Sequence, residues 1–274
     1  MLNEIQAVIL GIVQGLSEFL PISSSGHLIL VREVFHFPDP GKTFDIMMHL
    51  GTLIALIVYF WGDLVRLFSG FFRQIVKEKK AWGTLETDMV WFIVISTIPG
   101  GILGLLYNDW LESIRNVYLI SSLLIVFGVI LWIVDRKSPK SKTLDRLTAY
   151  DALIIGVMQA LALFPGVSRS GISMTAVMLL GFTREDAARY SFLISIPLIG
   201  GTSIYGLAKI ISSGPDSSAV IVLALGVAAS FISGLLCIKF LLDFLKKRTF
   251  NGFVIYRVLL GLFLILWSMM GRIN

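Results

Sequence analysis

Residues 150–182 read YDALIIGVMQALALFPGVSRSGISMTAVMLLGF. Two apolar stretches flank a polar centre that holds Pro165, two glycines, three serines and Arg169. Neither apolar half reaches the roughly 20 residues with which a helix crosses a bilayer. The break frees backbone groups that lipid cannot satisfy, so it must be buried in protein or line a wet cavity. The segment is therefore predicted to form a re-entrant helical hairpin with Arg169 at its tip.

Residues 5–30, IQAVILGIVQGLSEFLPISSSGHLIL, are a second copy of this segment. A shift of 145 residues without gaps gives nine identities over positions 7–26. The matched pairs are Ala7 with Ala152, Ile9 with Ile154, Gly11 with Gly156, Gln14 with Gln159, Leu16 with Leu161, Phe19 with Phe164, Ser23 with Ser168, Ser25 with Ser170 and Gly26 with Gly171. Apolar bias does not supply a glutamine, two serines and a glycine in register. We interpret the two segments as an internal repeat and predict a second re-entrant hairpin.

The composition is that of an integral membrane protein. Of the 274 residues 56% are hydrophobic and only 15% are charged, whereas about a quarter are charged in soluble domains. Six further apolar segments are long enough to span a bilayer, and they cover residues 46–62, 88–107, 117–134, 190–210, 218–242 and 253–271. The predicted fold is an all-α integral membrane protein, one domain of six transmembrane helices plus two re-entrant helical hairpins.

The order of these elements predicts an inverted-topology repeat. The first repeat is 1–135 and the second is 145–274, each a hairpin followed by three transmembrane helices. Because a re-entrant hairpin returns to its own side, three crossings place the second hairpin on the opposite side from the first. The two tips are then expected to meet near the middle of the membrane.

Loop charge predicts the orientation. Fifteen lysines and arginines lie in the loops 63–87, 135–149, 183–189 and 243–252. The other side has five, which are Arg32, Lys42, Arg115, Lys209 and Arg272. By the positive-inside rule the rich side is cytoplasmic and both termini lie outside.

Other function classes lack support in the sequence. The net charge of +5 comes from short loops, and no basic groove with interleaved aromatic residues is present, so no nucleic-acid partner is expected. Cys237 is the single cysteine, which excludes an internal disulfide, and no Cys/His spacing typical of a metal site occurs.

The two predicted tips together carry the groups of a phosphate site. The first offers Gln14, Glu18, Ser23, Ser24, Ser25 and His27, and the second offers Ser168, Arg169 and Ser170. An arginine fork grips two phosphate oxygens, and helix N-termini and hydroxyls bind others. A serine attacks phosphorus only when a base activates it, and Glu18 or His27 can be that base.

Each of these residues also has a plainer interpretation. The serines can be helix N-caps, Glu18 and Arg169 can form a structural ion pair between the repeats, and His27 can be a packing residue. Gln14 can simply hydrogen-bond a neighbouring helix. The i,i+4 pair Asp45 and His49 either supports the site from behind or lies at the membrane interface, and the interface is favoured. Leu163 stands where the second repeat would match Glu18. The repeats have thus diverged into an acid side and an arginine side, which a symmetric scaffold would not need.

With these residues identified, the chain resembles the undecaprenyl-diphosphate phosphatases, also called bacitracin-resistance proteins, over essentially its whole length. The resemblance is carried by QGLSEFLPISSSGH at 14–27 and PGVSRSGIS at 165–173. The first family motif, Glu or Gln, three residues and Glu, falls on Gln14 and Glu18, with its serine and histidine on Ser24 and His27. The second, P-G-x-S-R-S-x-x-T, falls on Pro165, Gly166, Ser168, Arg169, Ser170 and Ser173.

The resemblance implies the reaction and its participants. A polyprenyl diphosphate in the bilayer loses its terminal phosphate at the outer face of a bacterial plasma membrane, with a divalent cation, Mg²⁺ or Ca²⁺, held through Glu18. The product is the carrier lipid of cell-wall synthesis, and more of the protein counters bacitracin. A homodimer is also implied.

The resemblance also assigns roles to residues of this chain. The implied catalytic residues are Glu18, Ser24, His27 and Arg169. The motifs add Gln14, Gly166, Ser168, Ser170 and Ser173 as candidate substrate-binding residues, and the first predicted tip adds Ser23 and Ser25.

Two departures from the family pattern bear on these roles. Gln14 stands where many members have Glu, so Glu18 bears the acid role alone. Ser173 replaces a threonine and keeps its hydroxyl.

The sequence leaves two questions open. Either Ser24 or His27 can be the nucleophile, with Ser24 the favoured one. A transporter or flippase for a phosphorylated lipid or anion would use the same inverted repeat without an activated nucleophile. A purely structural membrane scaffold does not explain polar groups buried at both tips.

Overall fold

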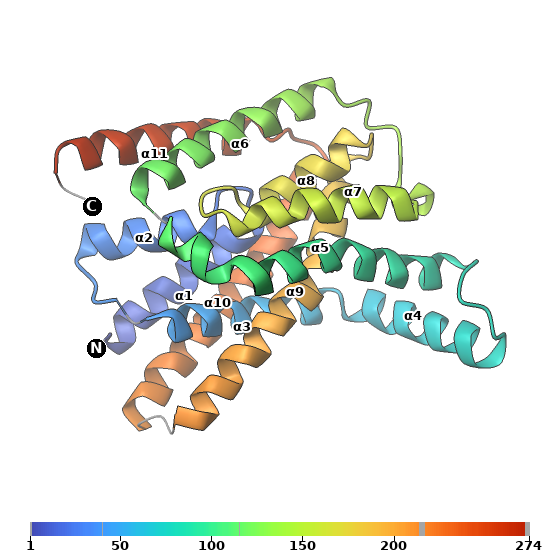
Figure 1. Ribbon diagram of the computed structural model, residues 1–274, viewed down its shortest axis with the longest axis horizontal. Coiled ribbons are helices and arrows are strands. Elements are labelled where there is room, and N and C mark those ends of the chain that lie inside the picture. The colour runs from blue at the N-terminus through green and yellow to red at the C-terminus, as the bar shows by residue number, and fades with distance from the viewer. Residues whose placement is uncertain (1, 40, 115, 214–216, 272–274) are drawn as a thin grey trace.

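The chain is all-helical in its computed structural model, which describes residues 2–39, 41–114, 116–213 and 217–271. Over these residues the structure has eleven α-helices and no β-sheet (Figure 1). The predicted all-α class is confirmed. Two residues of the charge argument, Arg115 and Arg272, lie outside the described residues.

Long apolar helices identify a multi-pass membrane protein. Five helices are long and apolar enough to cross a bilayer, and they are α5 (Leu85–Ser113), α6 (Val117–Lys137), α9 (Arg184–Ser213), α10 (Ser217–Leu245) and α11 (Asn251–Met269). A sixth span is present if α3 (Lys42–Tyr59) and α4 (Trp61–Phe72) count as one, since they are bent by 73° at Phe60.

The helix α4 corrects one sequence expectation. Residues 63–87 were expected to be a loop between the apolar segments 46–62 and 88–107, yet α4 and a π-helical turn, Arg73–Lys77, continue to residue 77. Apolar residues recur at helical spacing in this segment, and Leu67 is buried. Exposed basic side chains, Arg66, Arg73 and Lys77, interrupt the apolar sequence here, but exposed apolar residues such as Phe68 and Phe72 lie between them and the helix continues.

Two helix–break–helix units coincide with the predicted hairpins. The first is α1 (Glu4–Phe19) and α2 (Ser24–Phe35), and the second is α7 (Ala149–Ala160), a 3₁₀ turn at Leu161–Leu163, and α8 (Arg169–Leu179). In Figure 1 the first unit extends inward from the left and the second from the right, so that the breaks face each other in the centre. The hydroxyl of Ser170 donates to the carbonyl of Leu20 at 2.9 Å, which links the two breaks directly.

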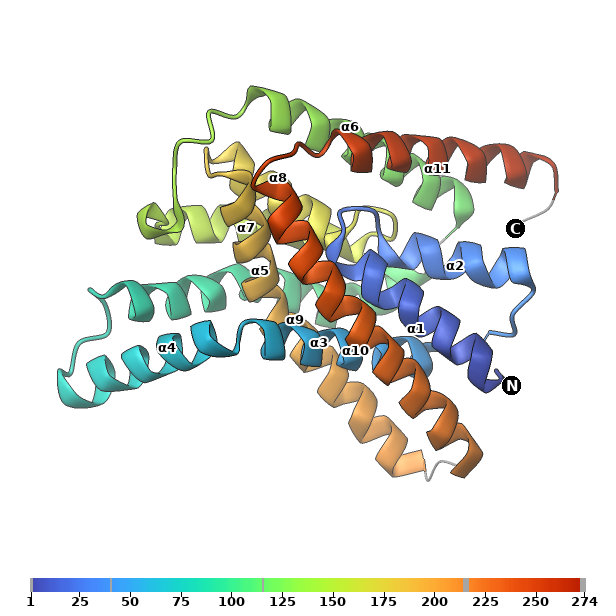
Figure 2. The same ribbon diagram turned by 180° about the vertical axis from the view of Figure 1, so that it is seen from behind.

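Each unit packs against the other half of the chain. The helix α1 lies along α10, as Figure 2 shows, and α7 lies along α5. A Cβ on Gly11 would lie 2.2 Å from the carbonyl oxygen of Gly226, and one on Gly156 would lie 2.8 Å from that of Ser96. Glycine at these two matched positions therefore lets helix backbones approach closely, as in other membrane helix pairs.

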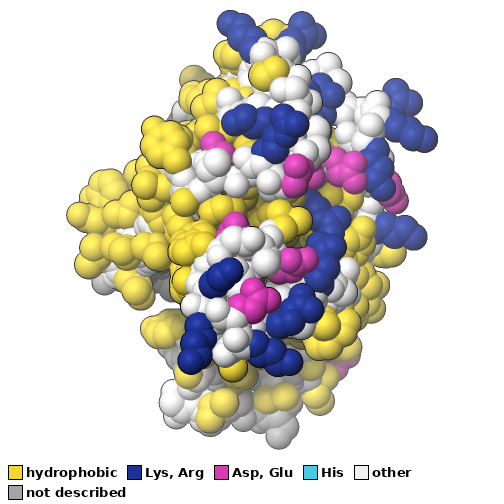
Figure 3. Space-filling view, turned by 90° about the vertical axis from the view of Figure 1, so that its right-hand side faces the viewer, with side chains coloured by type: hydrophobic (Ala, Val, Ile, Leu, Met, Phe, Trp, Pro, Cys, Tyr) yellow, Lys and Arg dark blue, Asp and Glu magenta, His cyan; other side chains and the backbone are white. Residues whose placement is uncertain are grey.

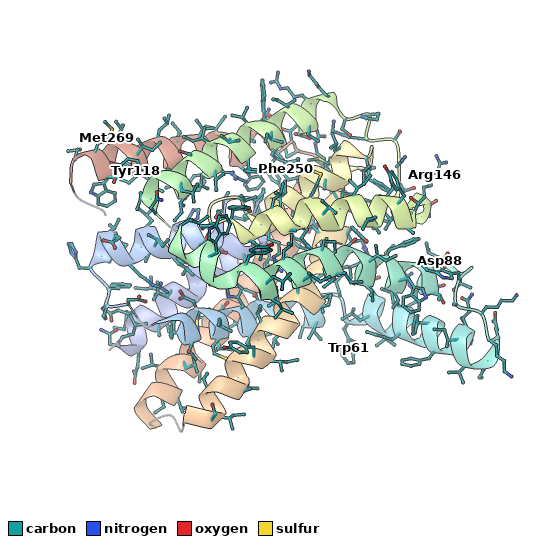
Figure 4. The ribbon with its side chains drawn as sticks, in the orientation of Figure 1. Trp61, Asp88, Tyr118, Arg146, Phe250 and Met269 are labelled. Carbon is teal, nitrogen blue, oxygen red and sulfur yellow. The ribbon has the colours of Figure 1, made fainter. Side chains whose placement is uncertain are left out.

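Basic side chains gather at one end of the molecule. Figure 3 shows many lysines and arginines, with interspersed acidic groups, on the end that lies at the right in Figure 1. Figure 4 places Asp88 and Arg146 at that end, and Tyr118 and Met269 at the other. The helix α1 begins and α11 ends at the end away from the basic face.

Candidate active site

The two breaks share an unusual backbone conformation. Ser23, directly before α2, has φ 73° and ψ 100°, and Ser168, directly before α8, has φ 72° and ψ 111°. A positive φ is uncommon for residues other than glycine and marks a locally constrained site. The hydroxyls of Ser23 and Ser25 lie 3.2 Å apart, and those of Ser168 and Ser170 lie 3.2 Å apart.

Glu18 is the centre at which the two breaks meet. Its buried carboxylate pairs with the guanidinium of Arg169. The other carboxylate oxygen, Oε2, accepts hydrogen bonds from Gln14 Nε2 and Ser24 Oγ, each at 2.8 Å. Glu18 and Arg169 are 151 residues apart in sequence, so only the packing of the two units brings them together. A serine hydroxyl that donates to a carboxylate at this distance has the geometry for base-assisted attack.

A cavity of about 230 Å³ opens beside this cluster. Its polar wall contains Glu18, Ser24, Arg169 and three further serines, which are Ser23, Ser25 and Ser168. Its other wall is mostly apolar. It is formed by the break of the second unit and by α5 and α9, and it includes Leu163, Phe164, Leu198 and Ile199. A ligand with a charged head and an apolar tail matches the two walls.

Two helix N-termini lie at the polar wall. Ser24 is the first residue of α2 and Arg169 is the first residue of α8. The N-terminal turn of a helix carries free N–H groups and a partial positive charge, which favour an anion. The polar wall therefore combines one arginine, two helix N-termini and four hydroxyls around one carboxylate.

Several residues predicted to bind substrate lie behind the cavity instead. Gln14 reaches Glu18 but is not part of the lining. Ser170 bonds the carbonyl of Leu20, and Ser173 bonds Gln159 Oε1 at 3.3 Å. Gly166 has φ 97°, and a Cβ there would lie 2.4 Å from the carbonyl oxygen of Ile120. The structure gives these residues positioning contacts rather than contact with the cavity.

His27 is not among the residues that line the cavity. Its ring is buried, with Nδ1 2.7 Å from the carbonyl oxygen of Ser23 and Nε2 2.6 Å from the hydroxyl of Tyr256. The His27 and Tyr256 rings also stack, with centroids 5.4 Å apart. Both ring nitrogens are thus engaged away from Glu18.

The imidazole that faces Glu18 belongs to His49, which was expected at the interface. His49 on α3 lines the cavity, and its Nε2 lies 3.6 Å from Glu18 Oε2. Its helical neighbour Asp45 instead pairs with Arg32 on α2. The sequence signal was present, since a histidine inside an apolar run marks a functional site by default.

Sequence reasoning missed Arg257 altogether. This arginine on α11 is 0% exposed. It donates to the carbonyls of Pro21 in the first break and of Gly166 and Val167 in the second, at 3.0–3.2 Å, and to Leu124 on α6 at 3.0 Å. Among the described residues, no carboxylate lies within ion-pair distance of it. Arg257 therefore ties both breaks to the same helix, and its place in the apolar run 253–271 was the available signal.

Comparison with known proteins assigns the chain to a family. Residues 7–263 match the family described as bacitracin resistance protein BacA. An undecaprenyl-diphosphatase of Saccharophagus degradans is 45% identical over 96% of this chain and 98% of its own length. Proteins of the same name from Hahella chejuensis and Myxococcus xanthus are 44% and 41% identical, over 96% and 98% of this chain and 97% and 91% of their own. The chain belongs to the bacitracin-resistance (BacA) family.

Proposed function

We propose that this protein hydrolyses undecaprenyl diphosphate to undecaprenyl phosphate and inorganic phosphate. The observation that carries the proposal is the meeting of Glu18, Ser24 and Arg169 on the polar wall of a cavity whose other wall is apolar. The apolar wall suits the lipid and the polar wall suits the diphosphate. The relatives are named for this reaction. Release of the monophosphate carrier supports cell-wall synthesis and bacitracin resistance.

Ser24 is the proposed nucleophile. Glu18 takes the hydroxyl proton while Ser24 Oγ forms a bond to the terminal phosphorus. The bond between that phosphorus and the bridging oxygen breaks, and undecaprenyl phosphate leaves with its electron pair and a proton. Water then cleaves the phosphoserine, which releases phosphate and restores the hydroxyl. Direct attack by His27, the histidine of the first motif, remains the rival to this step.

Arg169 is the proposed phosphate clamp. Its guanidinium now pairs with Glu18, and an entering phosphate offers a second anionic partner to the same planar fork. Sharing Arg169 with the phosphate leaves Glu18 freer to accept a proton from Ser24. Negative charge that spreads over the transferred phosphoryl group is then stabilised by Arg169 and by the two helix N-termini.

The donor atoms near Glu18 fit a hard divalent cation. Mg²⁺ is commonly held by one or two carboxylates together with phosphate oxygens of the substrate. Glu18 offers one carboxylate, and Gln14 Oε1 is a buried oxygen without a hydrogen-bond partner. Glu18 would hold a Mg²⁺ or Ca²⁺ ion together with the diphosphate. The ion supplies positive charge that Arg169 alone does not provide against a diphosphate.

The proposal includes the membrane topology. The two helix–break–helix units are re-entrant hairpins of an inverted repeat, 1–135 and 145–274. Their entry from opposite ends and the matched partners of α1 and α7 support this. The basic end faces the cytoplasm of a bacterial plasma membrane, the termini and the active site face outward, and the protein is a homodimer. Cysteine labelling of single-cysteine variants from each side checks the orientation, and light scattering checks the dimer.

Phosphate release by the purified protein tests the function. Wild type in detergent is expected to release phosphate from undecaprenyl diphosphate with Mg²⁺ or Ca²⁺, and not with EDTA. Folded wild type that binds the lipid without releasing phosphate would overturn the proposal in favour of a lipid transporter. A trapped phospho-enzyme that is stable to acid and labile to alkali supports Ser24, whereas the reverse pattern identifies His27.

A further inference from the structure

His49 has one ring nitrogen fixed and the other directed at the site. On α3, its Nδ1 lies 2.8 Å from the carbonyl oxygen of Asp45, one turn earlier in the helix. Its Nε2 lies 3.6 Å from Glu18 Oε2, and the side chain keeps 31% of its surface exposed. Both His49 and Glu18 line the same cavity.

The bond to Asp45 determines which nitrogen carries the proton. A backbone carbonyl only accepts, so Nδ1 of His49 must be the donor. In the neutral ring, Nε2 then holds a lone pair, and this lone pair faces a carboxylate oxygen. Glu18 Oε2 already accepts hydrogen bonds from Gln14 and Ser24. A proton on the ring or a metal cation between the two atoms would make their approach to 3.6 Å favourable. A backbone bond on Nδ1 is the usual way in which a metal-binding histidine is oriented.

The orientation of His49 is supported from the next helix. Arg32 on α2 grips both carboxylate oxygens of Asp45, with Nη1 3.1 Å from Oδ2. This pair joins α2 to the first turn of α3, the turn that supplies the carbonyl for His49. The imidazole is therefore held by the backbone on one side while its free nitrogen stays in the cavity.

A second observation around Glu18 points to a cation. Gln14 donates its amide nitrogen to Glu18 Oε2, while its amide oxygen is buried and has no hydrogen-bond partner. A buried amide oxygen without a donor is costly. A cation beside Glu18 would favour the flipped amide, which would bring this oxygen to the ion.

We propose that His49 Nε2 and Glu18 Oε2 bind one divalent cation together, so that the ion of the proposed reaction has a nitrogen ligand. This inference rests on the proposed function. Ligand atoms at about 2.1 Å from a shared metal ion lie roughly 3–4 Å apart, and the two atoms are 3.6 Å apart. Ca²⁺ takes oxygen ligands, whereas a site with nitrogen and oxygen ligands binds the first-row divalent metals, of which Mn²⁺ binds most weakly. His49 is therefore expected to raise the affinity for Mn²⁺ relative to Ca²⁺.

Pulsed electron paramagnetic resonance of bound Mn²⁺ tests the ligand directly. The full-length protein in detergent receives Mn²⁺ and a methylene-bridged polyprenyl diphosphonate, which is not hydrolysed. The chain has three histidines, at 27, 36 and 49, so ¹⁵N-histidine labelling and single Gln variants assign any nitrogen coupling. We expect an imidazole coupling in wild type that is lost in His49→Gln and kept in His36→Gln, which alters an exposed residue of the α2 C-terminus.

Metal titration supplies the second measurement. His49→Gln is expected to weaken Mn²⁺ binding about 10-fold or more and to change Ca²⁺ binding less than about 3-fold, with an unchanged melting temperature. A Mn²⁺ signal without imidazole coupling in wild type, or a coupling that survives His49→Gln, overturns the inference. If the protein releases phosphate but its Mn²⁺ has only oxygen ligands, the proposed function stands and the role of His49 as a metal ligand is rejected. If Mn²⁺ is bound by the imidazole but no phosphate is released, the metal ligand stands and the proposed function is rejected.

Discussion

The two breaks share one unusual serine conformation and differ in chemistry. Ser23 and Ser168 share a φ near 72° and each begins a helix. The next residue is Ser24 in the first break and Arg169 in the second, and five residues before each of these serines stand Glu18 and Leu163. One backbone geometry thus presents a hydroxyl and a carboxylate on one side and a cation on the other. The site forms because the two geometries face each other, which neither copy achieves alone.

The strongest test of this division is the charge pair. Arg169→Ala is expected to lower kcat/KM for undecaprenyl diphosphate about 10³-fold or more, since it removes the charge that stabilises the transferred phosphoryl group. Arg169→Lys keeps the positive charge but lacks the planar guanidinium that binds two phosphate oxygens. Its kcat/KM should therefore lie between those of Arg169→Ala and wild type. Phosphate release from detergent-solubilised protein measures both.

A charge swap separates catalysis from a merely structural ion pair. The double variant E18R/R169E retains opposite charges across the two breaks and is expected to keep most of the melting temperature of wild type. Activity should stay at the level of Arg169→Ala, because Ser24 then lies beside an arginine. Recovery of activity in the swapped protein would show that the pair only joins the repeats.

Arg257 ties the two breaks together, and its loss is the next effect in size. Arg257→Met keeps a side chain of similar length but leaves three buried carbonyls in the breaks, those of Pro21, Gly166 and Val167, without donors. The carbonyl of Leu124 lies inside α6 and keeps its helical hydrogen bond. Unsatisfied buried groups cost about 1–3 kcal/mol each, partly recovered by relaxation, so we expect the free energy of unfolding to fall by at least about 3 kcal/mol. Thermal unfolding in detergent measures this, and an unchanged melting temperature contradicts it.

The matched glycines Gly26 and Gly171 sharpen the comparison. A Cβ on Gly171 would lie 2.9 Å from Nη1 of Arg257, which its carbonyl bonds hold in place, whereas on Gly26 the nearest atom is 3.6 Å away. Gly171→Ala is therefore expected to cost about 1–3 kcal/mol of overpacking. Gly26→Ala serves as the matched control and should change stability by less than about 0.5 kcal/mol. Equal melting temperatures for the two variants would show that the Arg257 side chain can move aside to admit the new methyl group.

The smallest expected difference concerns the two serines with positive φ. Glycine at either position relieves the backbone, but Ser168 also caps α8 through Gly171 N at 3.2 Å, whereas Ser23 makes no such cap. Ser23→Gly is expected to be neutral or to stabilise by up to about 1 kcal/mol. The gain in stability from Ser168→Gly should be smaller by a few tenths of a kcal/mol, because this variant also loses the cap of α8. The same unfolding assay detects the order of the two variants, and the reverse order would contradict this account.

Most of the fold was readable because its signals are local. Apolar run length marks the spanning helices, and Pro, Gly and Ser mark the breaks at 20–23 and 164–168. The sequence misled where a local signal had two causes. The apolar run was expected to end near residue 62 and to give way to a basic loop, but the basic residues of 63–77 lie on α4 and on the turn that follows it, between exposed apolar side chains.

The sequence by itself determined the class of protein, the two broken segments and the placement of an acid in one segment and an arginine in the other. Composition and spacing specify these because each depends on neighbouring residues alone. Only the tertiary structure decided which histidine meets Glu18. His27 and His49 both lie in apolar surroundings, and helix packing turns His27 toward Tyr256 and His49 toward the cavity. It also decided the role of Arg257, since the carbonyls that hold this charge come from three distant parts of the chain.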